Sequence, residues 1–292
     1  MESLLSLSFD YLSCSDASKI RKGLKHLEGL LAQLCLCRSS SSTAADRRQS
    51  VINTGTTAQT PKELADLKDD PAFREFFKLQ EGFECNVAIR LIACLERLLG
   101  RGSNGQNDLL IISTLDLLQG ILLVHPPSRS LFAREIYMNL LLDLLDTSNC
   151  PAIQSSALLT LVVALLEQPH NTRTFETLDG LLTVTSLFKS RSTGRDLKLK
   201  LVEFLYFYLM PETPYTYSAS APTTAVGGQR SPSKRSGPYG QSPSGPGASD
   251  GSEIAGTKST EEKQALLGQY LNNVEDLVED LRGSAPFGPA LG

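Results

Sequence analysis

The residues of this chain that could carry out chemistry are few, and their spacing fits no familiar reaction. Gly100-Arg-Gly102-Ser-Asn-Gly105 has the spacing of a dinucleotide-binding loop, whose glycines let the backbone approach a pyrophosphate. Such a loop must follow a strand, whereas the segment from Leu91 to Leu99 has the apolar periodicity of a helix. We therefore interpret these glycines as a turn between helices and expect no nucleotide or other cofactor.

The cysteines and histidines form no catalytic or metal-binding pattern either. No cysteine is followed six positions later by the arginine of a cysteine-dependent phosphatase loop, and the sequence lacks a Gly-x-Ser-x-Gly elbow, a Walker loop and a kinase signature set. Cys35-x-Cys37 has no second pair at zinc-finger spacing, and His26, His125 and His170 are far apart in sequence. We therefore predict no catalytic residues, no bound metal and no enzymatic activity.

Composition narrows the class of protein further. The 292 residues carry a formal charge of −4, and this mild acidity disfavours a dedicated nucleic-acid binder. No apolar run reaches the ~18 residues of a membrane-spanning helix, and the first residues lack the basic region of a secretory signal. The six cysteines lie mostly in apolar periodic segments, as reduced thiols do. We expect a soluble cytoplasmic protein that binds neither membranes nor nucleic acid.

The elements that must position the candidate residues are predicted to be helices. Between Ser3 and Cys37 the apolar residues recur every three or four positions, which predicts one or two amphipathic helices. Residues 38–60 are polar and aperiodic, which predicts an internal loop. Thr60-Pro61 and Asp70-Pro71 each have the form of a helix start, with a capping side chain before a first-turn proline.

Beyond residue 107 the sequence repeats with an offset of 43 residues. Pro126 aligns with Pro169 and Phe132 with Phe175, and the leucines at 115, 118, 122 and 123 align with those at 158, 161, 165 and 166. A period of roughly 40–47 residues containing only helical patterns is typical of armadillo and HEAT units. We therefore predict an all-α, armadillo/HEAT-like helical solenoid over residues 1–211.

A change in composition marks the end of this domain. Of the 47 residues from 211 to 257, 24 are Pro, Gly or Ser, so residues 212–259 are predicted to be a disordered linker. Residues 260–283 are predicted to form one amphipathic C-terminal helix, because Leu267, Leu271, Val274, Val278 and Leu281 follow at spacings of four and three. Its apolar seam needs a surface; we favour docking on the chain's own solenoid over docking on a partner.

Basic and amide side chains gather around the inter-helix turns, and they are the candidate partner-binding residues: Arg129, Arg134, Asn171, Arg173, Lys189, Arg191 and Arg195. One interpretation is a basic rim for an acidic or phosphorylated partner. The other is a solvated loop edge in which these side chains cap helices. The groove itself is expected to be lined by segments such as Glu135–Asp146 and Leu178–Lys189.

Three serines have the form of kinase substrates. Ser231 lies in a Ser-Pro-x-Lys sequence and Ser242 precedes a proline, as proline-directed kinases require, whereas Ser50 follows two arginines. A phosphate adds ~1.5–2 negative charges, here close to Arg230 and Lys234. We expect phosphorylation of Ser231 and Ser242 to tune activity through the cell cycle, and Ser50 is a further candidate phosphorylation site.

Four long segments resemble one family. They are DPAFREFFKLQEGFECNVAIRLIACLERLL, DLLQGILLVHPPSRSLFAREIYMNLLLDLLD, NTRTFETLDGLLTVTSLFK and LKLKLVEFLYFYLMPETPY. Together with the final VEDLVEDL they are similar to the fungal cell division control protein 14 family, a component of the septation initiation network. This family is distinct from the dual-specificity phosphatase of the same name, and the absence of the phosphatase loop from this sequence is consistent with that distinction.

The resemblance implies a function. It points to a non-catalytic binding and regulatory subunit of a germinal-centre-type protein kinase, acting at the spindle pole body to promote septum formation and cytokinesis. The alternative is an armadillo-type adaptor that recruits signalling proteins to a phosphorylated spindle-pole-body scaffold. The family carries over no residue-level binding site.

Overall fold

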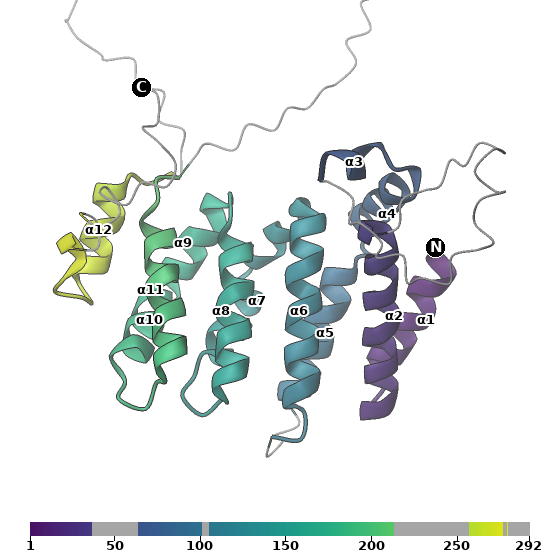
Figure 1. The fold of residues 1–292 in the computed structure, drawn as a ribbon, viewed down its shortest axis with the longest axis horizontal. Helices are drawn as coiled ribbons and strands as arrows, with labels where there is room; N and C mark the ends of the chain where they lie inside the picture. Colours follow the sequence, from purple (N-terminus) through teal and green to yellow (C-terminus); the bar gives the residue numbers. More distant parts are fainter. Residues whose placement is uncertain (37–63, 101–104, 213–256, 277–278, 280–292) are drawn as a thin grey trace, which may run out of the picture.

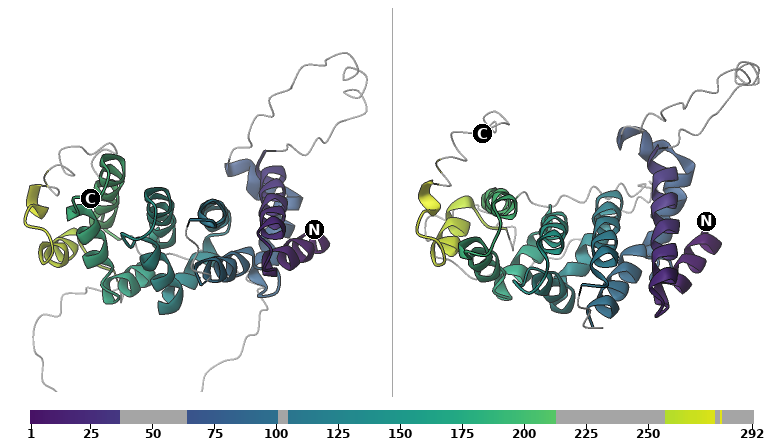
Figure 2. Two further views of the ribbon diagram at one scale, coloured as in Figure 1. Left: turned by 90° about the horizontal axis from the view of Figure 1, so that it is seen from below. Right: turned by 60° about the horizontal axis from the view of Figure 1, so that its bottom comes forward.

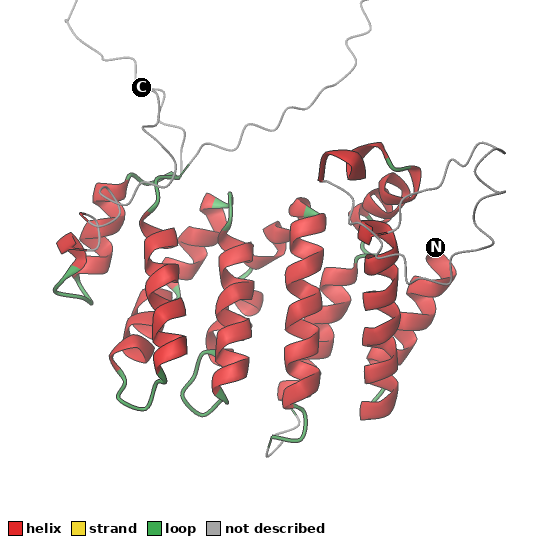
Figure 3. Ribbon diagram, in the orientation of Figure 1, coloured by secondary structure: helices red, strands yellow, loops and turns green. Residues whose placement is uncertain are grey.

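The computed structural model describes residues 1–36, 64–100, 105–212, 257–276 and 279, and every regular element in these ranges is a helix (Figure 3). The all-α prediction is thus confirmed for the part of the chain described. The predicted loop at 38–60 and nearly all of the predicted linker at 212–259 lie outside these ranges, as do Ser50, Ser231 and Ser242.

The helices form two layers in a shallow, curved row (Figures 1 and 2). The row bends toward its inner layer, which consists of α2 (Ala17–Leu36), α6 (Asp108–Val124), α8 (Pro151–Leu165) and α11 (Arg195–Leu209). The outer layer contains α1 (Glu2–Ser13), α5 (Val87–Leu99), α7 (Glu135–Leu144) and α10 (Gly180–Lys189), with the short η2 (Pro126–Ala133) and α9 (Pro169–Thr177) at its edge. One end carries α3 (Leu64–Asp69) and α4 (Pro71–Glu81), and the other carries α12 (Thr260–Gly268).

The helix start predicted at Asp70-Pro71 is present, whereas the one predicted at Thr60-Pro61 lies outside the described residues. The Asp70 carboxylate accepts the Ala72 N–H at 2.8 Å, which satisfies a backbone donor that has no partner within α4. At the start of α12, the Ser259 hydroxyl accepts the Glu262 N–H and the Glu262 carboxylate accepts the Ser259 N–H, which is a reciprocal capping box.

The 43-residue repeat corresponds to a repeated structural unit. α6 and α8 begin 43 residues apart, as do η2 and α9, and the aligned Phe132 and Phe175 are both completely buried. The units differ in their first short helix. η2 begins with two prolines, which remove two backbone donors and favour the tighter 3-10 form, whereas α9 begins with one.

Packing within one unit is close at the turn from α9 to α10. Asp179 adopts the left-handed conformation (φ 57°), and Gly180 then lies against the buried ring of Phe175. A Cβ atom at Gly180 would lie 2.2 Å from Cε2 of that ring, so the turn requires glycine. The apolar core is otherwise continuous, with buried side chains from Leu5 at one end to Val274 at the other.

The C-terminal segment differs from the single helix predicted over 260–283. α12 ends at Gly268, residues 269–273 turn, and helical geometry resumes at Val274. Gly268, Asn272 and Asn273 are weak helix formers, and the break lets Leu267 and Val274 both reach the core. α12 packs on α11, so the described part of this segment docks on its own chain, as favoured above.

Candidate partner-binding face

Two helices of the inner layer are mostly apolar and carry almost no charge. α8 has no charged residue in its 15 positions, and α6 has only Asp108 and Asp116 in its 17. A helix that is apolar all round is normally buried all round. Here the outer-layer helices α5, α7 and α9 cover one side of these two, and no described residue covers the other (Figure 2).

The uncovered side exposes large apolar side chains on three adjacent helices. We call this set the inner apolar face: Leu109 (73% exposed) and Leu123 (50%) on α6, Leu159 (41%) on α8, and Leu199 (61%) on α11 with Met210 (44%) at the C-cap of that helix. A group of exposed apolar side chains on one face is a candidate site for binding another protein.

Polar contacts between the inner helices hold this face in shape. The Ser156 hydroxyl on α8 donates to the Asp116 carboxylate on α6 at 3.0 Å, and Gln119 donates to the Ser156 carbonyl at 3.2 Å. On the other side of α8, the Lys200 ammonium of α11 donates to the Ser155 hydroxyl. Ser113 and Asp116 of α6 and Glu203 of α11 are also exposed, so apolar and polar side chains alternate on these helices.

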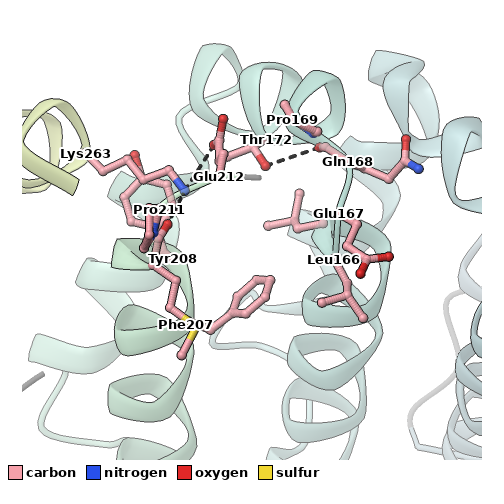
Figure 4. Close-up of a pocket in the computed structure, with 12 residues that line it drawn as sticks. Leu166, Glu167, Gln168, Pro169, Thr172, Phe207, Tyr208, Pro211, Glu212 and Lys263 are labelled. Atoms are coloured by element: carbon pink, nitrogen blue, oxygen red, sulfur yellow. Dashed lines mark hydrogen bonds and ion pairs between the residues drawn. The ribbon is translucent and has the colours of Figure 1, made fainter. Parts of the chain in front are cut away.

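A small hollow of about 130 Å³ lies where the carboxyl ends of α8 and α11 meet (Figure 4). Leu166 and Phe207 line it from the two helices, and Glu212 and Lys263 lie at its edge. Its floor is apolar and it adjoins Met210, so it extends the inner apolar face toward α12. A pocket of this kind suits an aliphatic anchor of a partner better than a polar substrate.

Charged side chains fasten α12 beside this hollow. Lys263, which is buried, pairs with the Glu212 carboxylate at 3.0 Å and donates to the Met210 carbonyl at 2.9 Å. Burial lowers the pKa of Lys263, and the hydrogen bond to Glu212 opposes that shift. Glu212 also pairs with Arg173, so each buried charge has a partner of opposite sign.

The same cluster joins the two chain ends that flank residues 213–256. The Lys258 N–H donates to the Glu212 carboxylate at 2.9 Å, and the Lys258 ammonium pairs with Glu176 at 2.6 Å. Glu176 also accepts the Tyr208 hydroxyl at 2.8 Å. Burial is the main cause that raises the pKa of Tyr208 above its usual range, and the hydrogen bond to Glu176 adds to it. The hydroxyl therefore stays protonated and acts as a donor.

The predicted basic rim needs correction at two positions, because Arg129 and Asn171 are buried. The Arg129 guanidinium donates to the Leu122 carbonyl at 3.0 Å and to the Leu166 carbonyl at 3.1 Å, which caps the ends of α6 and α8. The Asn171 amide donates to the Arg129 carbonyl at 2.8 Å. These side chains join one unit to the next and are not available to a partner, as the helix-capping alternative implied for Arg129.

The other candidates lie in different settings. Arg173 is occupied by Glu176 and Glu212, and the exposed Lys189 donates to the Tyr270 carbonyl beyond α12. Arg134, Arg191 and Arg195 are exposed, and no contact among the described residues joins these three into one patch. They remain candidate binding residues.

The prediction of which segments line the groove was wrong. Glu135–Asp146 and Leu178–Lys189 correspond to α7 and α10, which lie in the outer layer (Figure 1). The inner surface consists instead of the helices that begin each 43-residue period. The sequence signal that could have found them is the absence of charge from α8, since a two-layer stack cannot cover both of its sides.

Two further features bear on the class of protein. Within the described ranges no group of three or more His, Cys, Asp or Glu side chains could hold a metal ion. No single described helix is long and apolar enough to cross a membrane; α6 with η2 reaches that length only across a 117° bend.

The described residues form an all-helical protein of repeated units with large apolar side chains exposed on one face. The chain belongs to the family described as cell division control protein 14, SIN component, which it matches over residues 1–287. It is 31% identical over 229 residues to "Cell division control protein 14" of Schizosaccharomyces pombe, covering 75% of this chain and 81% of that protein. No solved structure matches it. The family is a component of the septation initiation network, which controls cell division.

Proposed function

We propose that this chain is a non-catalytic regulatory subunit of a germinal-centre-type protein kinase in the septation initiation network, and that it promotes septum formation and cytokinesis. The inner apolar face is the observation that carries the proposal. Five large apolar side chains on three neighbouring helices lie exposed, which a protein without a partner would have to keep in water. Family membership supports the cellular setting.

The repeated helical units support an armadillo-like architecture. Each unit comprises a short helix and two longer ones, stacked with an offset of 43 residues, and the row is curved. Such stacks present an extended concave surface to their partners. The kinase therefore docks along α6, α8 and α11, where aliphatic anchors provide the affinity.

A pair of leucine variants tests this proposal. Leu159 on α8 is 41% exposed and Leu182 on the outer helix α10 is 46% exposed, so they are matched in type and exposure and differ in face. Leu159→Asp is expected to abolish co-purification of the kinase from dividing cells, whereas Leu182→Asp retains it. Both variants are to be checked for native helix content by circular dichroism. Equal retention of the kinase by the two variants contradicts the proposal.

The exposed arginines favour a second candidate, in which the chain is an adaptor for a phosphorylated spindle-pole-body scaffold. Arg134, Arg191 and Arg195 are free to meet phosphate groups. Reversing all three to glutamate tests this role. Loss of localisation to the spindle pole body with kinase binding retained favours the adaptor, and loss of kinase binding together with localisation favours the kinase subunit.

A further inference from the structure

Residues 257–276 form a segment that is seated on one end of the row of helices. Its helix α12 packs on α11. Within this segment only three side chains are buried, those of Lys263, Leu267 and Val274. The segment is therefore held by two apolar anchors together with polar contacts, and the polar contacts decide which sequence fits.

The surface beneath the segment is fixed by groups that do not belong to the segment. Arg173 on α9 pairs with Glu176 at 3.3 Å and also with Glu212, which follows α11. The Tyr208 hydroxyl donates to the Glu176 carboxylate at 2.8 Å. The helices from α1 to α11, with the residues that follow to Glu212, we call the helical body. Its own side chains therefore hold both carboxylates in position, which makes them a preorganised acceptor site.

Lys263 of α12 enters this acceptor site (Figure 4). Its ammonium lies 3.0 Å from the Glu212 carboxylate, donates to the Met210 carbonyl at 2.9 Å and lies 5.3 Å from the centre of the Tyr208 ring. A lysine ammonium has three donors and is attracted to an aromatic face, so it fits this combination of groups. Leu267 lies one helical turn further along and is completely buried. The site thus accepts a helix with a lysine and, four residues later, a leucine.

The other charges at this contact agree with that assignment. Lys258 pairs with Glu176 at 2.6 Å, so both lysines of the segment meet carboxylates of the helical body. Lys189 of α10 donates to the Tyr270 carbonyl. The acidic residues of the segment, at positions 261, 262, 275 and 276, are all exposed. The two surfaces are therefore complementary in charge, with the positive side on the segment.

α12 depends on this docking for its helical form. It has nine residues, and a helix of that length is marginal in water by itself. The capping box at Ser259 supports only its first turn. The helical body, by contrast, has a core that extends from Leu5 to Leu209 without the segment. Leaving the site therefore costs the segment its helix and leaves the body folded.

We propose that the surface formed by Glu176, Tyr208 and Glu212 is a binding site for a lysine-bearing amphipathic helix, and that residues 257–276 are its ligand within the same chain. The segment binds and leaves as one unit while the helical body stays folded. Because ligand and site belong to one polypeptide, the site sees this ligand at a high effective concentration. The inference does not rest on the proposed kinase binding, which concerns the inner apolar face.

Amide hydrogen exchange of the full-length chain tests whether the segment is a separate unit. Glu212→Gln removes the charge that Lys263 meets, and Glu203→Gln makes the same change at an exposed position of α11. Glu212→Gln is expected to accelerate exchange in α12 by about tenfold or more and to leave α6 and α8 unchanged, whereas Glu203→Gln changes neither. Equal acceleration in α12 and α8, or wild-type exchange in α12, would overturn the inference.

A fluorescent peptide with the sequence of residues 257–276 tests the site itself. In full-length Leu267→Asp the chain's own segment is expected to leave, because the buried leucine is its anchor, and hydrogen exchange verifies that it has left. Fluorescence anisotropy should then show that this variant binds the peptide, that the wild-type chain binds it more weakly because its own segment competes, and that a peptide with Lys263→Glu binds about tenfold more weakly or worse.

Three results would contradict the proposed site. They are a helical Leu267→Asp chain that does not bind the peptide, equal affinity for the two peptides, and a segment that stays protected from exchange in Leu267→Asp. None of these results bears on the kinase, whose binding is read from Leu159→Asp. The two proposals can therefore fail separately.

Discussion

Arg129 offers a sharp test of whether the basic residues at the turns are structural or functional. Its side chain is 4% exposed and donates to the Leu122 and Leu166 carbonyls, at the ends of two successive inner helices. In Arg129→Met the methionine keeps much of the packing volume but removes both donors. Each buried carbonyl left without a partner costs about 1–3 kcal/mol. We therefore expect a loss of about 2–5 kcal/mol in the free energy of unfolding, out of the roughly 5–15 kcal/mol typical of folded domains.

The measurement is urea unfolding followed by circular dichroism at 222 nm, with Arg191→Met as the control. Arg191 is exposed in the turn before α11, so its replacement should change the free energy of unfolding by no more than about 0.5 kcal/mol. Equal urea midpoints for the two variants would refute the structural role of Arg129. A folded, stable Arg129→Met protein that no longer binds the kinase would show instead that Arg129 contributes to partner binding.

Two further perturbations have outcomes that follow from the geometry. Gly180→Ala is expected to destabilise the protein by about 1–3 kcal/mol, because the new methyl group overlaps the Phe175 ring, whereas Gly29→Ala, in an open part of α2, should be neutral or slightly stabilising; equal thermal midpoints would contradict this. His125 is 2% exposed, and burial lowers its pKa from 6.5 to about 4. The unfolded chain therefore takes up a proton below pH 6.5 that the folded chain refuses until about pH 4, so up to about 3 kcal/mol of stability is lost as the pH falls through that window. His125→Gln should flatten this part of the stability profile relative to His170→Gln, at an exposed histidine, and an unchanged slope would show that His125 does not cause it.

The helices could be predicted from the sequence because their signals are local. Asp70-Pro71 begins α4 as its capping chemistry indicates, and Pro126 and Pro169 begin the short helices of successive units. The repeat was equally visible, since Phe132 and Phe175 align and are both buried. Periodicity of this kind depends only on which residues must leave water.

The roles of particular polar residues could not be predicted in the same way. An arginine at a turn has the same sequence signature whether it points into solvent or, as Arg129 does, onto two helix ends, one of which is 37 residues away in the sequence. The inner face was assigned to the wrong helices for a related reason. In a two-layer stack the direction of curvature depends on the packing of all units together, and no single segment such as Glu135–Asp146 encodes it.

The contact between Glu212 and Lys258 has a consequence for changes in the length of the segment between them. The Glu212 N–H donates to the Lys258 carbonyl at 3.5 Å, so the two attachment points of residues 213–256 are neighbours on the surface. For a loop whose two ends are held close together, doubling the length costs only about 0.6 kcal/mol of closure entropy. The segment is therefore attached to the helical body at a single position on its surface. Deletions, extensions or a whole inserted reporter domain can be accommodated there while the helical body keeps its shape.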